Sequence, residues 1–309
     1  MLKVPRLLLI FFIYFMPSSL LGMGDPFDIT LSFLGWRHDS LNTEVERLSS
    51  SKKKTQTQRI KALDIDVWSF GFKGRTTLSG LLFYEEGFWR EHFYLKGSAY
   101  RGWMKHGTFK DQQPGNRVHS KEKIHSSIHS GRTLDADIGV GFSIPLSWWL
   151  SLGPVGGYSF NKQKILLNDH SHSSGESSFE KLKYTVKWKG PFAGVDLIMD
   201  VFCFRVQGGY EYHFGTWSGL WDLSLRKSSH SSSSSSSRQH SPRARGQIGY
   251  VDIRFEYTEG FDVGLGIRYQ SWKTHKGEVS RKNDSKEEGK LSKATWQSYG
   301  VTCDIVYRF

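Results

Sequence analysis

The last eleven residues, YGVTCDIVYRF at positions 299–309, alternate in polarity and decide the fold class. One face of an extended strand here carries Tyr299, Val301, Cys303, Ile305, Tyr307 and Phe309. The other face carries Thr302, Asp304 and Arg308, and Val306 is its only apolar exception. In a soluble β-sandwich the apolar face would point to a core. In a membrane barrel it would point to lipid and the polar face to the lumen.

The same period of two recurs along the chain, and no long stretch after Asp25 spaces its apolar residues as a helix would. We predict ten antiparallel strands, at residues 27–37, 60–77, 91–107, 132–143, 148–164, 180–197, 203–217, 247–257, 261–275 and 294–309. Tight turns are expected at 144–147, 198–202 and 258–260. Long connections are expected at 39–59, 108–131, 165–179, 218–246 and 276–293. An even strand number with alternating short and long connections is typical of a transmembrane β-barrel with long extracellular loops.

Composition narrows the class of protein further. The 309 residues are 38% hydrophobic and 15% aromatic, with a net charge of +12. So many aromatic side chains exclude disorder for most of the chain. A mean hydropathy of −0.47 argues against several membrane helices, but it suits a barrel in which only alternate residues face lipid. The two cysteines, Cys203 and Cys303, make neither a disulfide framework nor a zinc site, and we expect both to be unpaired.

The two ends of the chain indicate export. Lys3 and Arg6 precede an apolar run over residues 7–15, and Gly22 and Gly24 follow it. This order is typical of a secretory signal, because an anchoring helix would need a longer apolar run. We therefore predict a signal peptide over residues 1–24 and an outer-membrane barrel over residues 25–309. The aromatic end, Phe309, resembles the C-terminal signature that the barrel assembly machinery reads in bacterial outer-membrane proteins.

Tryptophans fall mostly near the strand ends that this pattern predicts. Interfacial belts favour such rings because they are half apolar and half polar. We predict a membrane-interface belt rather than a filled core for Trp68, Trp89, Trp103, Trp148, Trp149, Trp188, Trp217, Trp221, Trp272 and Trp296.

Charged residues inside the predicted strands would be costly against lipid and should line the lumen. They are Asp135, Asp137, Asp196, Arg205, Asp252, Arg254 and Arg268. A ten-stranded lumen is narrow, so these side chains should fill it and hinder general diffusion.

Several stretches together resemble the omptin family of outer-membrane β-barrels. They are YLKGSAYRGW (94–103), LDADIGVGF to VGGYSF (134–160), YTVKWKGPFAGVDL (184–197), GGYEYHFGTW (208–217) and the last strand. They occur in the right order and span most of the mature chain. The resemblance implies a ten-stranded barrel, and known omptins are proteases that depend on aspartate and histidine.

The residues that omptin proteolysis requires are not matched. Omptins carry an Asp-x-Asp pair after the third strand's Gly-Trp and an Asp-x-His pair near the top of the seventh strand. Here Asp111 is followed at the second position by Gln113, and Asp222 by Ser224. The next histidine, His230, lies in a serine tract at the wrong spacing. We therefore expect no omptin-type catalytic residues, although a protease with a rearranged site or a narrow channel remains an alternative.

Basic residues crowd the predicted external loops and favour an acidic partner. The candidate contacts are Lys52, Lys53, Lys54, Lys121, Lys123, Arg238, Arg243 and Arg245. Lipopolysaccharide phosphates, other outer-membrane lipids and host polyanions would suit them. Nucleic acid would suit the charge too, but it is excluded by the location. The scattered histidines lack convergent geometry, so we expect no metal and no other cofactor.

Overall fold

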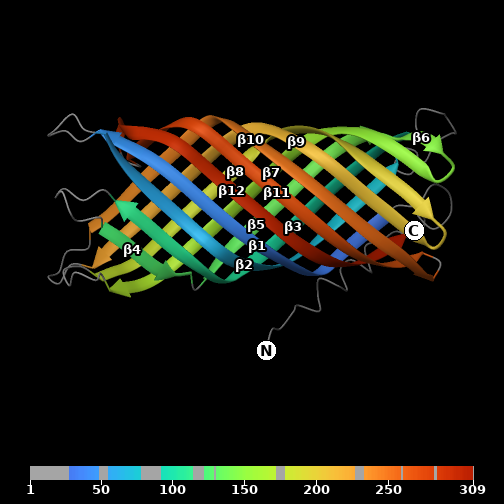
Figure 1. The fold of residues 1–309 in the computed structure, drawn as a ribbon, viewed down its shortest axis with the longest axis horizontal. Helices are drawn as coiled ribbons and strands as arrows, with labels where there is room; N and C mark the ends of the chain where they lie inside the picture. Colours follow the sequence, from blue (N-terminus) through green and yellow to red (C-terminus); the bar gives the residue numbers. More distant parts are fainter. Residues whose placement is uncertain are drawn as a thin grey trace.

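The computed structural model describes residues 28–48, 55–77, 92–113, 122–128, 130–171, 178–226, 233–258, 260–281 and 284–308. Over these residues the chain forms an antiparallel β-barrel (Figure 1). Its long strands are β1 (Asp28–Leu48), β2 (Thr55–Thr77), β3 (Phe93–Gln113), β5 (Ser130–Phe142), β7 (Leu150–Ser171), β8 (Ser178–Val201), β9 (Phe204–Arg226), β10 (Ser233–Thr258), β11 (Phe261–Arg281) and β12 (Asp284–Arg308). Among the described residues, no helix is long and apolar enough to cross a membrane.

The ring closes where β1 pairs with β12, and each other barrel strand pairs with its neighbours in the chain. Two short strands continue the place of β5 in the ring, one beyond each of its ends. β4 (Glu122–Ser127) pairs with β3, and β6 (Ile144–Ser147) pairs with β7. Since neither adds a strand to the ring, the predicted ten-stranded antiparallel fold is confirmed.

The strands are longer than the sequence pattern predicts. Tight turns lie at residues 148–149 and 202–203, at the end of the barrel that we call the turn end. At the opposite end, which we call the loop end, β1 runs on to Leu48 and β10 begins at Ser233. The predicted connections at 39–59 and 218–246 are therefore mostly strand. Backbone pairing continues there although the outward side chains are polar, so no outward apolar row marks these extensions.

In the turn-end half, the outer wall is apolar and the interior is polar. On the last strand, Tyr299 is 52% exposed, whereas Asp304 is 0% exposed and faces inward. Both faces therefore point as the alternation predicts. At about 3.3 Å per residue and a tilt of about 40°, the span from Tyr299 to Tyr307 covers roughly 20 Å along the barrel axis. That height is close to the apolar band of an outer-membrane barrel.

The strands reach well past this band. A strand of 23 residues, such as β9, covers about 58 Å along the axis at the same rise and tilt. More than half of the barrel's height therefore lies outside the apolar band, and the loop end accounts for most of it.

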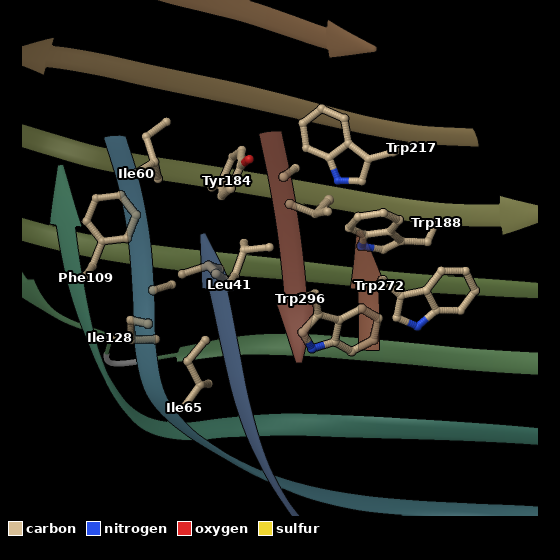
Figure 2. Close-up of a cluster of buried hydrophobic side chains, with 14 of the residues drawn as sticks. Leu41, Ile60, Ile65, Phe109, Ile128, Tyr184, Trp188, Trp217, Trp272 and Trp296 are labelled. Carbon is tan, nitrogen blue, oxygen red and sulfur yellow. The ribbon is translucent and has the colours of Figure 1, made fainter. Parts of the chain in front are cut away.

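In the loop-end half the polarity is reversed: the outer wall is hydrophilic and the interior is apolar. We call this interior the apolar layer. Its largest fully buried side chains are Trp188, Trp217, Trp272, Trp296, Tyr184, Phe109, Leu41, Ile60, Ile65, Ile128 and Ile165. Figure 2 labels all of them except Ile165 and shows the labelled side chains projecting from several strands into one space. The ring centroid of Trp188 lies 5.7 Å from that of Trp272 and 6.0 Å from that of Trp217, so these rings pack against one another inside the barrel.

The predicted tryptophan belt is thus wrong for the five rings that contribute to this interior. Trp188, Trp217, Trp272 and Trp296 are fully buried, and Trp221 packs against the apolar layer. All but Trp188 lie away from strand ends because β9, β11 and β12 extend past the predicted ends, whereas Trp188 was already in the middle of its predicted strand. Trp89 lies outside the described residues.

Aromatic belts do exist on the outer wall, where exposed tyrosine and phenylalanine rings accompany the exposed tryptophans. At the loop-end edge of the apolar band the exposed rings are Trp68, Trp103, Tyr158, Phe214, Tyr269 and Tyr299. Towards the turn end they are Trp148, Trp149, Phe202, Tyr257 and Tyr307. Both cysteines are free, with Cys203 exposed at a tight turn and Cys303 on the outer wall, as predicted.

One close approach between strands requires glycine. A Cβ atom on Gly190 of β8 would overlap the carbonyl oxygen of Phe214 and the Cα atom of Gly215 on β9. These are backbone atoms, so a side-chain rotation cannot relieve the overlap. A Cβ atom on Gly249 would meet nothing within 4 Å.

We therefore expect Gly190→Ala to destabilise the barrel by about 3 kcal/mol, at the upper end of overpacking costs. Gly249→Ala should leave stability unchanged. The measurement is the temperature at which the refolded protein in detergent loses its folded gel mobility. Equal midpoints for the two variants would contradict the close approach.

Candidate functional site

The basic residues predicted from sequence occupy different kinds of position. Arg238, Arg243 and Arg245 lie on β10 and are exposed on the outer wall of the barrel, not in a connecting loop. Lys123 lies on β4, but its side chain is not among the described ones. Lys52, Lys53, Lys54 and Lys121 lie outside the described residues. The structure therefore brings three of the eight together, on one strand.

Other cations, which sequence reasoning missed, extend this patch across neighbouring strands. They point outward because they alternate with buried residues: Lys164 lies between Gln163 and Ile165, and Lys187 between Val186 and Trp188. This alternation is the signal that could have found them. We define the basic wall as Lys162, Lys164, Lys183, Lys187, Arg238, Arg243, Arg245 and Lys273, on β7, β8, β10 and β11.

The basic wall surrounds a hollow of about 730 Å³ on the outer surface of β7 to β10. Its charged or titratable lining residues are Lys162, Lys164, Lys183, Lys187, Arg238 and His240. Asp222 approaches Lys183 at 3.8 Å, and both side chains are partly exposed. Such an exposed pair neutralises little of the surrounding charge. The hollow therefore has a positive potential suited to an anionic ligand.

Cross-strand register places like charges directly opposite one another. Lys162 is opposite Lys187 across β7 and β8, and Arg245 is opposite Lys273 across β10 and β11. Facing like charges destabilise a sheet by several tenths of a kcal/mol or more. A bound anion would remove this repulsion. Nearby, burial together with Lys273 and Lys293 lowers the pKa of His275, so this imidazole adds no charge at neutral pH.

The interior of the turn-end half is an ion-pair layer organised by two lysines. The Nζ atom of Lys96 lies 2.9 Å from both the Asp196 and the Glu211 carboxylates and 3.2 Å from the Tyr250 hydroxyl. The Nζ atom of Lys73 lies 2.8 Å from Asp252 and 2.7 Å from Asp304. Each lysine therefore links strands across the lumen.

The charges predicted to line the lumen are mostly found there. Asp135, Asp196, Asp252 and Arg254 are buried, and Asp137 accepts a hydrogen bond from Ser98. Arg268 faces a small interior cavity. Arg205 pairs instead with Asp200 beside a turn, where both side chains are partly exposed. Sequence reasoning did not single out Lys73, Lys96, Arg37, Glu211 or His213, although each has inward parity.

A carboxylate, an imidazole and a hydroxyl form a chain at the border between the two layers. The Nε2 atom of His213 lies 3.1 Å from the Glu211 carboxylate, and its Nδ1 atom lies 2.8 Å from the Ser159 hydroxyl. A carboxylate only accepts, so Nε2 donates and the Nδ1 of a neutral ring accepts from Ser159. Hydrolases use the same order of groups, but there the serine bonds Nε2 and the carboxylate bonds Nδ1. Here all three residues are buried, and the imidazole lies between Phe192 and Trp272.

Among the described side chains, no group of three or more histidine, cysteine or acidic residues is arranged to hold a metal ion.

Comparison with known proteins identifies the family. A family model described as Pom, Protochlamydia outer membrane protein, matches residues 32–309. The chain belongs to the Pom family. The match begins within β1 and covers the rest of the barrel, and it makes this chain a β-barrel protein of the bacterial outer membrane.

The solved structure of an omptin supports the same fold for this Pom family member. The outer membrane protease OmpT from Escherichia coli matches with a TM-score of 0.66 and 11% identity, over 94% of this chain and 100% of that one. A FadL homologue from Pseudomonas aeruginosa covers 94% of this chain, with a TM-score of 0.31 and 6% identity. No curated protein matches the chain. The resemblance to omptins therefore holds for the architecture, since identity this low carries fold alone.

The two aspartates that remain of the omptin pattern do not converge. Asp111 on β3 is fully buried, and its two carboxylate oxygens each accept a hydrogen bond of 3.0 Å from the Gln58 side chain. Asp222 on β9 has outward parity and accepts a 2.7 Å hydrogen bond from Ser236. One carboxylate therefore faces the apolar layer and the other faces the outer wall.

Removing a lysine from the ion-pair layer should destabilise the barrel strongly. We expect Lys96→Met to cost about 3–5 kcal/mol, because Asp196 and Glu211 would stay buried without their cation. Lys105→Met is the matched control, since Lys105 is exposed on the same strand. Urea unfolding followed by tryptophan fluorescence measures both. A Lys96→Met protein as stable as the control would show that the layer holds its charges without this lysine.

Proposed function

We propose that this protein is a non-enzymatic, surface-exposed barrel whose basic wall binds acidic saccharides. The ligands that suit it are the phosphates of outer-leaflet lipopolysaccharide and sulfated or carboxylated host polymers. The observation that carries the proposal is the hollow of about 730 Å³, whose charged lining is cationic and spans β7 to β10.

The height of the wall above the membrane supports a saccharide partner. On β11, Lys273 lies four residues beyond Tyr269 of the aromatic belt, towards the loop end. On β7, Lys162 and Lys164 lie four and six residues beyond Tyr158. At about 3.3 Å per residue and a tilt of about 40°, these cations stand roughly 10–15 Å above the belt. Headgroup phosphates and surface polysaccharides occupy that zone.

The enclosure of the interior supports a role without catalysis. The Ser159–His213–Glu211 chain has the order of groups of a hydrolytic relay, but its three members are buried. A general base must come within hydrogen-bond reach of the substrate proton that it removes. A peptide at the loop end would first have to displace the tryptophans of the apolar layer.

Neutralising the wall should weaken polyanion binding. The test variant replaces Lys162, Lys164, Lys187 and Arg238 with glutamine. Four exposed contacts of roughly 0.5 kcal/mol each correspond to about 30-fold weaker binding at low salt. Retention on immobilised heparin and on immobilised lipopolysaccharide are the two measurements, and they distinguish a host polymer from the outer leaflet.

The matched control removes the same charge from other strands, with Lys61, Lys105, Lys290 and Lys293 replaced by glutamine. It should keep most of the binding. If both variants lose binding equally, net charge and not the wall is responsible. If the unmodified protein binds neither polymer at low salt, the proposed function fails.

A narrow channel is the second candidate, and one observation favours it. A cavity of about 120 Å³ lies in the ion-pair layer, lined among others by Lys73, Lys96, Asp137, Arg254 and Arg268. Conduction would also require a path through the apolar layer.

With the apolar layer in place, we expect the intact protein to show no steady conductance steps in planar bilayers. The layer interposes packed indole rings where ions would need water. Reproducible single-channel steps at neutral pH would favour the channel and require the tryptophans to part.

A further inference from the structure

Within the residues that the structure describes, one seam of the barrel is unpaired on both of its sides at the loop end. Hairpins meet there in five places, and in four of them at least one of the two facing strands is paired to within one residue of its described end. The strand ladder reaches Arg47 between β1 and β12, Arg59 opposite Gln112 between β2 and β3, Ser178 opposite Arg226 between β8 and β9, and Ser237 opposite Arg281 between β10 and β11. The fifth ladder, between β5 and β7, ends with Ser130 opposite Leu166.

Beyond that point the two sides of the seam run on without pairing. Residues 122–126 of β4 form a ladder with β3, and residues 167–171 of β7 form a ladder with β8. Within the part of the chain that the structure describes, no strand pairs with the other edge of either segment. Figure 1 shows β4 at the end of the barrel opposite β6, which lies at the turn end.

Such an edge offers a row of backbone N–H and C=O groups at strand spacing. An extended peptide can pair with that row, as in the recognition mode called β-augmentation. We propose that this seam binds an extended peptide segment of another protein, which adds to the unpaired edge of residues 122–126. The inference does not rest on the proposed polyanion binding, because its main contact is backbone pairing, although Lys164 of the basic wall also flanks the seam.

The charge at the base of the seam specifies one end of the peptide. Arg132 on β5 and Lys164 on β7 face each other in register just below the open part, and both point outward. Lys110 on β3 flanks β4 at the position opposite His125. An acidic residue at the membrane-proximal end of the peptide would lie near these cations.

A second copy of this chain in the same membrane does not suit the seam. Barrel strands tilt by about 40°. Two upright barrels that met at this seam would present β4 strands that tilt in opposite senses. The strands would cross at about 80° rather than run side by side. The partner is therefore a flexible segment of a different protein.

Hydrogen–deuterium exchange of the refolded full chain in detergent micelles tests the inference. The probe is a synthetic ten-residue peptide of alternating valine and threonine that ends in two glutamates. Alone, the protein should exchange the amides on the free edge of residues 122–126 rapidly and the amides bonded to β3 slowly. Saturating peptide should slow the rapid set by about tenfold or more.

Two comparisons make the result decisive. The double variant Arg132→Gln, Lys164→Gln should bind this peptide several-fold more weakly, yet bind a peptide ending in two glutamines as the unmodified protein does. Residues 178–182 of β8, which pair with β7 on one side and with β9 on the other, should gain no protection. Slow exchange of the whole of 122–126 before peptide is added, or equal protection at every hairpin tip, would overturn the inference.

Discussion

The whole structure depends on a reversal of polarity along every long strand. A strand sends alternate side chains to opposite sides, and in this barrel the apolar set faces out near the membrane and in beyond it. On β11, Leu265 and Tyr269 face outward in the apolar band, while Trp272 faces inward only three residues further on. Side chains keep alternating between the outside and the inside along the strand. At the aromatic belt the outward row changes from apolar to polar, and the inward row changes from polar to apolar.

The two interior layers solve different physical problems. Within the membrane the lumen must hold polar groups, so lysines and carboxylates compensate one another, as Lys96 does with Asp196 and Glu211. Beyond the membrane the outer wall is hydrated, and the interior becomes the core of an ordinary water-soluble domain. Because side chains pack both interior layers, a large ligand would contact the outer wall and the loop end of the barrel rather than its interior.

The sequence predicted the architecture but not the extent of the strands. Alternation correctly indicated both faces of the last strand over residues 299–307, since one row there is uniformly apolar. It did not indicate the start of β10, because the serines at 233–237 make the two faces of the strand equally polar. Trp217 was assigned to a belt because its predicted strand ended at that residue, whereas β9 runs on to Arg226. Trp188 lay in the middle of its predicted strand, so strand length does not explain its wrong assignment. Parity with Tyr184 and Val186 could have placed Trp188 inside. No sequence pattern predicted the facing lysines, because cross-strand register depends on the whole ring.

The reversal of polarity also protects the barrel against misalignment during assembly. Sliding one strand by a single residue exchanges its two faces. In a uniform barrel that error exposes charge to lipid along one stretch. Here the same error would have two effects at once. On β11 it would turn Arg268 towards lipid and turn Trp272 from the apolar layer out into water. The two halves of a strand therefore favour the same alignment. A strand shifted by one residue in the membrane would also place the wrong side chains in the apolar layer.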